Sequence, residues 1–168
     1  ISRQEADFGR EADGPWYYEQ IVLGFNYRMT DVQAALGLSQ LQHLDEWVKT
    51  RQTLATRYDL RLSALPLTLP FRSSDSLSAL HLYPVLVGDP SGKQRAEVFD
   101  LLRKAGIGVN VHYIPVHLQP DFAKYEFRIG DFPNSEAYYR RTISLPLFSS
   151  LSTSDQDKVM NALEAALT

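Results

Sequence analysis

The chain has 168 residues, enough for one domain with a modest hydrophobic core. Apolar residues make up 44% and charged residues 22%, and the net charge of −3 argues against a nucleic acid or an anionic membrane as the main partner. Cysteine is absent, which excludes disulfides, thiolate metal sites and a cysteine nucleophile and is compatible with the cytoplasm.

Residues 1–30 are expected to form a loop that enters the chain from something upstream. The chain opens on Ile1 rather than Met, and its first 16 residues are polar and charged without periodicity. An intact domain that had been processed or tagged would open in the same way. No apolar run approaches the ~20 residues of a membrane span, and no signal peptide is visible, so we expect no membrane partner.

A long helix is predicted over residues 31–65. Thr30 and Gln33 fit a capping box, and Asp31 suits the positive end of a helix. Apolar residues then recur at helical spacing: Leu41, Leu44, Val48, Ala55, Tyr58, Leu62 and Leu65. A straight helix of this length would span roughly 50 Å. It is too long for one small core, so we expect it to connect two domains or to kink.

Residues 66–168 are predicted to form an α+β domain. Pro66 and Pro70 end the long helix, and a serine-rich loop follows. Strands are expected over 81–87, 107–113 and 143–145. Helices are expected after the first strand, ending at about residue 104, then over 134–141 and from residue 153 onward. This order predicts a small antiparallel or mixed sheet with helices packed on one side. The last helix should bury Val159, Met160, Leu163, Ala166 and Leu167.

Metal chemistry finds little support in the sequence. The four histidines are His43, His81, His112 and His117, and none belongs to a recognised zinc pattern. There is also no G-x-S-x-G nucleophile elbow and no Walker loop. We therefore predict no metal site and no catalytic nucleophile of these kinds.

An anion site is possible just before the long helix. Asn26 and Arg28 precede a helix N-terminus, where their donors could hold a phosphate oxygen. The same residues would equally suit a turn and a surface ion pair. His112, Tyr113 and His117 form a second candidate, at a strand end that opens into a loop. His81 is a third. Each could also be a structural residue.

The segment Gly24–Leu41, with the sequence GFNYRMTDVQAALGLSQL, resembles the signature of the DegT/DnrJ/EryC1/StrS sugar aminotransferases. Three later segments agree in order: HLYP at 81–84, GIGVNVHYIPVH at 106–117 and SLPL at 144–147. The first motif is specific, whereas the later ones would be weak alone. The subgroup that the chain resembles most makes pseudaminic acid precursors by aminating C4 of a UDP-linked 4-keto-6-deoxy-N-acetylhexosamine.

The resemblance implies the C-terminal small domain of a fold-type-I, pyridoxal-phosphate (PLP) dependent homodimer, led by one long helix. Asn26 matches the family asparagine that reaches the cofactor phosphate of the other subunit, and Arg28 matches the arginine beside it. His112, Tyr113 and His117 match a loop near the sugar-nucleotide entrance. His81 is a weaker match of the same kind. Glutamate is the usual amino donor.

The family's lysine, which forms the internal aldimine, has no counterpart here. It belongs to a segment upstream of Asn26, and no lysine of this chain lies in such a context. We therefore expect the chain to be a C-terminal fragment that is inactive alone and binds no PLP, because the cofactor chemistry needs that Schiff base. Two alternatives remain: a stand-alone module that binds an anion or a sugar nucleotide, and a dimerisation domain. The sequence leaves open the exact sugar, the amino donor and the origin of the truncation.

Overall fold

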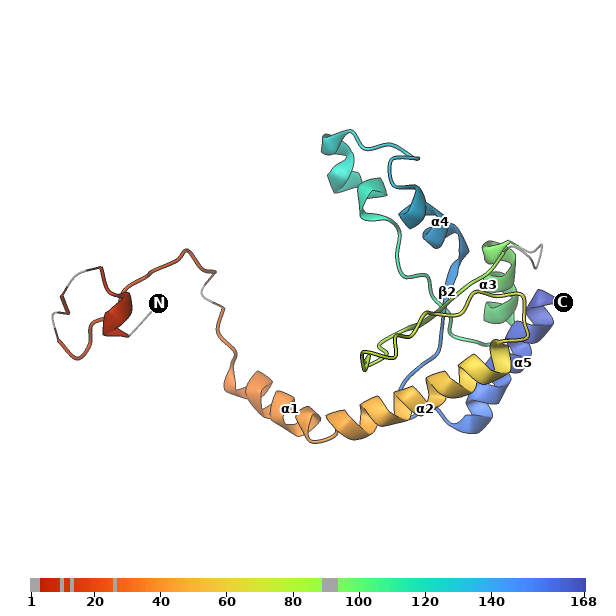
Figure 1. Cartoon of the computed structure of the whole chain (residues 1–168), viewed down its shortest axis with the longest axis horizontal. Helices are drawn as coiled ribbons and strands as arrows, with labels where there is room; N and C mark the ends of the chain where they lie inside the picture. Colours follow the sequence, from red (N-terminus) through yellow and green to blue (C-terminus); the bar gives the residue numbers. More distant parts are fainter. Residues whose placement is uncertain (1–3, 10, 13, 26, 89–93) are drawn as a thin grey trace. The chain divides into compact units, whose positions relative to one another are not determined.

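Two units make up the chain, residues 1–42 and residues 43–168, and each is described by itself. The computed structural model describes residues 4–9, 11, 12, 14–25, 27–88 and 94–168. The first unit contains a 3-10 turn, η1 (Glu5–Asp7), and one helix, α1 (Asp31–Leu41). The second unit contains the sheet and the remaining helices (Figure 1).

The predicted capping box begins α1. The Thr30 hydroxyl accepts a hydrogen bond from the Gln33 amide, and the Gln33 side chain accepts one from the Thr30 amide at 2.9 Å. These two bonds satisfy donors that the first helical turn would otherwise leave open. No described residue of α1 is buried, and its leucines and valine face solvent.

The helix expected over 31–65, either connecting two domains or kinking, is interrupted in the structure near Gln42 and His43. Helix α1 ends at Leu41, and α2 (Leu44–Leu62) begins a new hydrogen-bond ladder with the Trp47 amide donating to the His43 carbonyl. His43 adopts φ −102° and ψ −3°, which lies outside the regular helical geometry. Neither glycine nor proline marks this break in the sequence.

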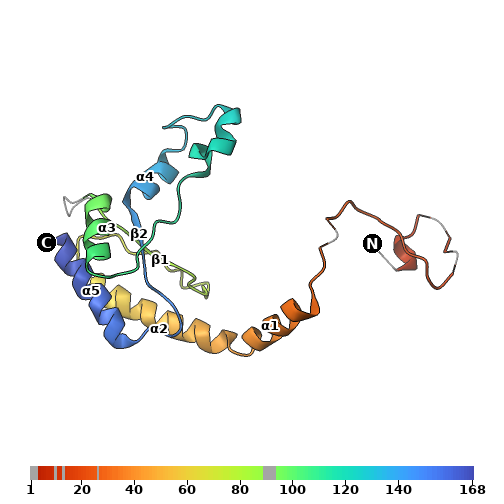
Figure 2. The same ribbon diagram turned by 180° about the vertical axis from the view of Figure 1, so that it is seen from behind.

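A two-stranded antiparallel sheet joins β1 (Tyr83–Leu86) to β2 (Thr142–Leu145), as Figure 2 shows. Tyr83 pairs with Leu145, and Leu86 pairs with Thr142. Every residue of β2 is buried, whereas β1 alternates between buried and partly buried positions. Strands were predicted at both places, and the antiparallel pairing confirms an α+β fold with a small sheet.

The strand predicted over 107–113 is wrong. Only Asn110 pairs with the sheet, through an isolated bridge to Ser144. The neighbouring amides bond locally instead: the Val109 amide donates to the Ile107 carbonyl, and the Val111 amide donates to the Asn110 side chain. A segment whose donors are used in this way cannot extend a ladder.

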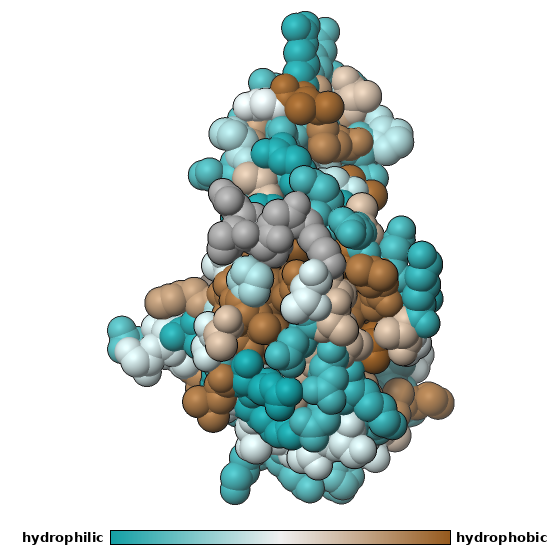
Figure 3. Space-filling view, turned by 90° about the vertical axis from the view of Figure 1, so that its right-hand side faces the viewer, coloured by the Kyte–Doolittle hydropathy of each residue, from teal (hydrophilic) through white to brown (hydrophobic). Residues whose placement is uncertain are grey.

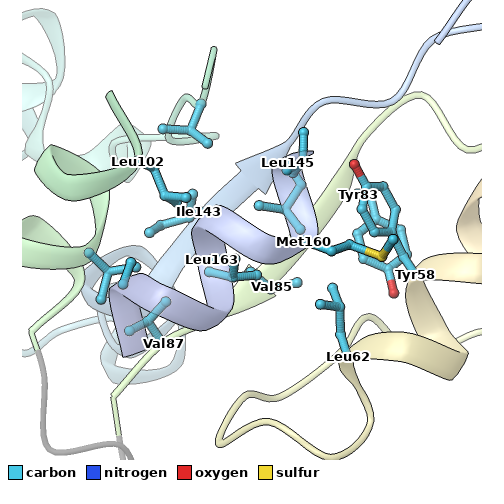
Figure 4. Packing of buried hydrophobic residues seen from close by; sticks show 14 of the residues in the cluster. Tyr58, Leu62, Tyr83, Val85, Val87, Leu102, Ile143, Leu145, Met160 and Leu163 are labelled. Carbon is cyan, nitrogen blue, oxygen red and sulfur yellow. The ribbon is translucent and has the colours of Figure 1, made fainter. Parts of the chain in front are cut away.

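Helices α2, α3 (Arg95–Lys104) and α5 (Thr153–Leu167) enclose the core with the sheet. Figure 4 shows Met160 of α5 beside the rings of Tyr58 and Tyr83. The apolar positions predicted for the last helix are all buried. Burying one such side chain stabilises the fold by about 1.5–3 kcal/mol, so α5 is a principal contributor.

An irregular excursion spans residues 111–132 and leads to α4 (Pro133–Arg141). It contains two 3-10 turns, η2 (Val116–Leu118) and η3 (Pro120–Tyr125). Its aromatic rings contact one another, and several of its apolar side chains are exposed. Figure 3 shows one face of the molecule, over which hydrophobic and hydrophilic residues are interspersed.

Candidate functional site

The predicted phosphate-binding pair lies in the first unit. Asn26 falls outside the described residues. Arg28 is exposed on the segment that leads into α1, and it takes part in an interaction of its own. The helix that follows places its N-terminus at Asp31. The binding role of Asn26 and Arg28 remains a prediction.

His112 is held against the sheet. Its Nδ1 lies 2.8 Å from the Ser144 hydroxyl oxygen, and Ser144 belongs to the buried strand β2. The ring of Tyr113 stands edge-on to the His112 ring, with 4.6 Å between centroids. Tyr113 itself is 67% exposed. The structure thus brings these two predicted residues together, one fixed and one open to solvent.

His117 is fixed by α4. Its Nε2 lies 3.1 Å from the Glu136 carboxylate, and the two side chains are only 7% and 6% exposed. The Phe132 ring packs on the imidazole, with 4.6 Å between centroids. His117 therefore has a different setting from His112, although both belong to the same predicted loop. His81 is exposed just before β1.

Sequence analysis missed the two residues that hold these imidazoles. Ser144 lies in the SLPL motif, whose position in β2 opposite Asn110 places it beside His112. Glu136 lies in the first turn of α4 and is buried, which is unusual for a carboxylate. The proline at the first position of α4 indicates a helix start but gives no sign that Glu136 turns inward.

The settings of the lysines bear on pyridoxal-phosphate chemistry, which uses a Schiff-base lysine. Lys49, Lys104, Lys124 and Lys158 are all exposed, and Lys93 lies outside the described residues. Lys124 and Lys158 form surface ion pairs with Asp121 and Asp155. None of these four lysine side chains is buried.

Two further observations concern metal ions and membranes. In the part of the chain that the structure describes, no group of three or more histidine or carboxylate side chains could hold a metal ion. None of the helices in that part combines the length and the apolar character that a membrane crossing requires.

Comparison with known proteins finds relatives that match about 90% of this chain. The spore coat polysaccharide biosynthesis protein SpsC of Bacillus subtilis is 42% identical over 156 residues, which are 90% of this chain and 40% of SpsC. The UDP-4-amino-4,6-dideoxy-N-acetyl-beta-L-altrosamine transaminase of Campylobacter jejuni is 33% identical over 155 residues, again 90% of this chain and 40% of that protein.

Solved structures share the fold. DesV of S. venezuelae, in complex with a ketimine intermediate, superposes with a TM-score of 0.80 and 32% identity, covering 91% of this chain and 41% of DesV. The chain thus spans about 40% of the length of the relatives it matches. The pattern of one family matches residues 3–164, nearly the whole chain, and the chain therefore belongs to the DegT/DnrJ/EryC1/StrS aminotransferase family.

Proposed function

We propose that this chain serves as the C-terminal part of a PLP-dependent nucleotide-sugar aminotransferase. The observation that carries the proposal is the family match over residues 3–164, with the specific motif at the start of α1. Family members are transaminases, and the name of the Campylobacter jejuni relative describes a transaminase of an amino sugar. The ketimine bound to DesV supports carbon–nitrogen chemistry of the same kind.

The substrate proposed is a UDP-linked 4-keto-6-deoxy-N-acetylhexosamine, with glutamate as the amino donor. The Campylobacter transaminase, whose product name describes a 4-amino-4,6-dideoxy UDP-sugar, supports this choice. We place the reaction in the cytoplasm, where nucleotide sugars and glutamate would both be available, and we propose that the enzyme works as a homodimer.

Within this proposal the chain's residues bind and orient, and they do not carry the bond changes. Asn26 and Arg28 would anchor a phosphate from the partner subunit, since both supply hydrogen-bond donors that suit an oxyanion. His112, Tyr113, His117 and, more weakly, His81 would contact the sugar nucleotide. Pyridoxal phosphate, held by the rest of the enzyme, would supply the electron sink for amino transfer.

Two assays test the proposal together. The chain alone is titrated with pyridoxal phosphate, reduced with borohydride and weighed as an intact protein. We expect no stoichiometric adduct, and one adduct at a single lysine would contradict that expectation. The longest reading frame that encodes this chain is then expressed and supplied with glutamate and the 4-keto UDP-sugar. Formation of the amino sugar supports the proposal, and its absence with a fully folded protein overturns it.

A dimerisation domain is the second candidate, and one observation favours it. Helix α1 has no buried described residue, and Val32, Leu36, Leu38 and Leu41 are each more than 60% exposed. An 11-residue helix is marginal in water by itself, so its apolar side chains need a covering surface. Self-association without any binding of a sugar nucleotide would favour this candidate over the first.

A further inference from the structure

A hollow of about 520 Å³ lies where the end of α3 meets the beginning of α5. This volume falls within the roughly 300–1,000 Å³ that small-molecule pockets of proteins occupy. The described residues that line it include none of those assigned above to a cofactor or a sugar nucleotide. They come from the segment after α3, from the loop between β2 and α5, and from α5 itself: 105–108, Pro146, Phe148, Leu151, Asp155, Lys158 and Val159.

Most of the wall of this hollow is apolar, and backbone hydrogen bonds fix it. The Leu151 amide donates to the Phe148 carbonyl at 3.0 Å, and the Ile107 amide donates to the Leu102 carbonyl at 2.9 Å. Leu151 is buried, whereas the Phe148 ring remains 49% exposed. An exposed ring beside a fixed apolar wall suits an apolar group of a ligand, because contact removes both surfaces from water.

One ion pair supplies all the charge among the described residues that line the hollow. Lys158 Nζ lies 2.7 Å from Asp155 Oδ1, and the Ser152 hydroxyl donates to Asp155 Oδ2 at 2.7 Å. The hydrogen bonds from Lys158 and Ser152 hold the pKa of the Asp155 carboxyl below its ordinary value, so it is ionised at neutral pH. The Lys158 and Asp155 side chains are 69% and 55% exposed, which leaves both charges accessible.

We propose that this hollow binds a free α-amino acid with an apolar side chain. The ammonium group bonds to Asp155, the carboxylate bonds to Lys158, and the side chain lies against Phe148 and Leu151. A ligand with one charge meets a like charge in the ion pair, whereas a zwitterion matches both of its members. The C-terminal end of α3, where the helix dipole is negative, also favours the ammonium group. The site goes beyond the proposed function, because it shares no residue with it.

The test titrates the full 168-residue chain with L-phenylalanine and follows the backbone amide signals by NMR. We expect saturable shifts centred on residues 105–108, 147–151 and 155–159. Phenethylamine lacks the carboxylate and 3-phenylpropanoate lacks the ammonium group, so each should bind more weakly by about fivefold or more. L-glutamate should be weaker by a similar factor, because its side-chain carboxylate would lose hydration against the apolar wall.

The variant Lys158→Gln isolates the contact with the ligand carboxylate. It should weaken the binding of L-phenylalanine by about fivefold or more, and it should not weaken the binding of phenethylamine, which has no carboxylate. Lys124→Gln is the matched control. Lys124 pairs with Asp121 three positions away, as Lys158 does with Asp155, but it does not line the hollow. The binding of both compounds should be unchanged in this control.

Four results overturn the proposal: no saturable shift at the hollow with L-phenylalanine, equal binding of L-phenylalanine and its two singly charged analogues, binding of L-glutamate as tight as that of L-phenylalanine, or equal effects of the two lysine substitutions. The comparison of ligands uses the unmodified chain, so it decides the matter even where a variant does not fold.

Discussion

Two buried tyrosines illustrate how single side chains connect α2 to the sheet. The Tyr83 hydroxyl donates to Asp59 at 2.6 Å, and the Tyr58 hydroxyl donates to the Pro146 carbonyl at 2.9 Å. Arg72 pairs with the other oxygen of Asp59 at 2.5 Å. Both phenol groups are fully buried, and their rings lie 4.8 Å apart. Each hydroxyl thus satisfies a polar group beside the core.

Alkaline pH should destabilise the protein through these phenols. Burial raises the pKa of Tyr58 and of Tyr83 above the ordinary value of 10.0, and the bond to Asp59 raises that of Tyr83 further. The neutral forms are favoured in the fold, so their contribution is complete below pH 10 and is lost as the pH rises above it. We expect the free energy of unfolding, measured with urea, to fall steeply there.

Tyr83→Phe is the matched variant for this prediction. It should cost about 1–2 kcal/mol at neutral pH, because the Asp59 carboxylate loses a donor. It should also make the free energy of unfolding fall less steeply at alkaline pH, because one of the two phenols with a raised pKa is gone. An alkaline slope as steep as that of the unmodified chain would contradict the assignment.

Residue-scale features differ in how visible they are in the sequence. The Thr30–Gln33 capping box is a local pattern, and the structure confirms it. The buried Glu136 is not visible, because its partners Gly130 and His117 approach only once the excursion folds back. Chain-distant contacts of this kind have no signature at the residue itself. The binding roles of Asn26, Arg28, His81, His112, Tyr113 and His117 stay predictions.

At the scale of elements, α5 shows how a helix is both started and anchored. Ser152 caps it, accepting a hydrogen bond from the Asp155 amide at 3.0 Å. Arg57 of α2 then bonds to Gln156 at 3.0 Å and to Asp157 at 2.6 Å. The buried Gln156 side chain in turn donates to the Leu54 carbonyl at 2.7 Å. Polar contacts therefore fix α5 against α2 beside the apolar core.

Removing the cap should weaken the whole second unit. Ser152→Ala deletes the acceptor of the first turn and should lower the free energy of unfolding by about 1 kcal/mol. The measurement is urea unfolding followed by circular dichroism. Ser150→Ala is the control, since Ser150 is an exposed residue in the turn just before the cap and should change stability little. Equal effects of the two substitutions would show that the cap contributes nothing particular.

Helix prediction succeeded for the later part of the second unit. Helices were expected up to about residue 104, over 134–141 and from 153 onward, and the structure contains α3, α4 and α5 at these places. The stretch 107–113 has the β-branched composition of a strand, yet local hydrogen bonds occupy its amides. Propensity describes what a segment can do, whereas pairing depends on which partner reaches it.

For the molecule as a whole, the exposed apolar side chains of α1 bear on assembly. Leu36 is 62% exposed and Val32, one turn earlier, is 79% exposed. If the chain forms dimers as proposed, this face is the one we expect to be covered. Leu36→Lys should therefore weaken self-association by about tenfold or more, since it places a charge in an apolar contact.

Sedimentation velocity over a range of concentrations measures this effect. Leu60→Lys is the matched control, because Leu60 is an even more exposed leucine, at 76%, on α2 of the second unit. It should leave the association constant unchanged. A chain that is monomeric at every concentration, or an equal effect of both substitutions, would contradict the assignment of α1 to the contact.

The pairing of β1 with β2 also determines how the second unit can fold. Tyr83 must find Leu145, and Gln156 must reach the Leu54 carbonyl across 102 positions of sequence. Closing such loops costs entropy before any core contact compensates for it, and this slows folding. The second unit should therefore acquire its core late and in one concerted step, at a rate set by topology more than by helix propensity.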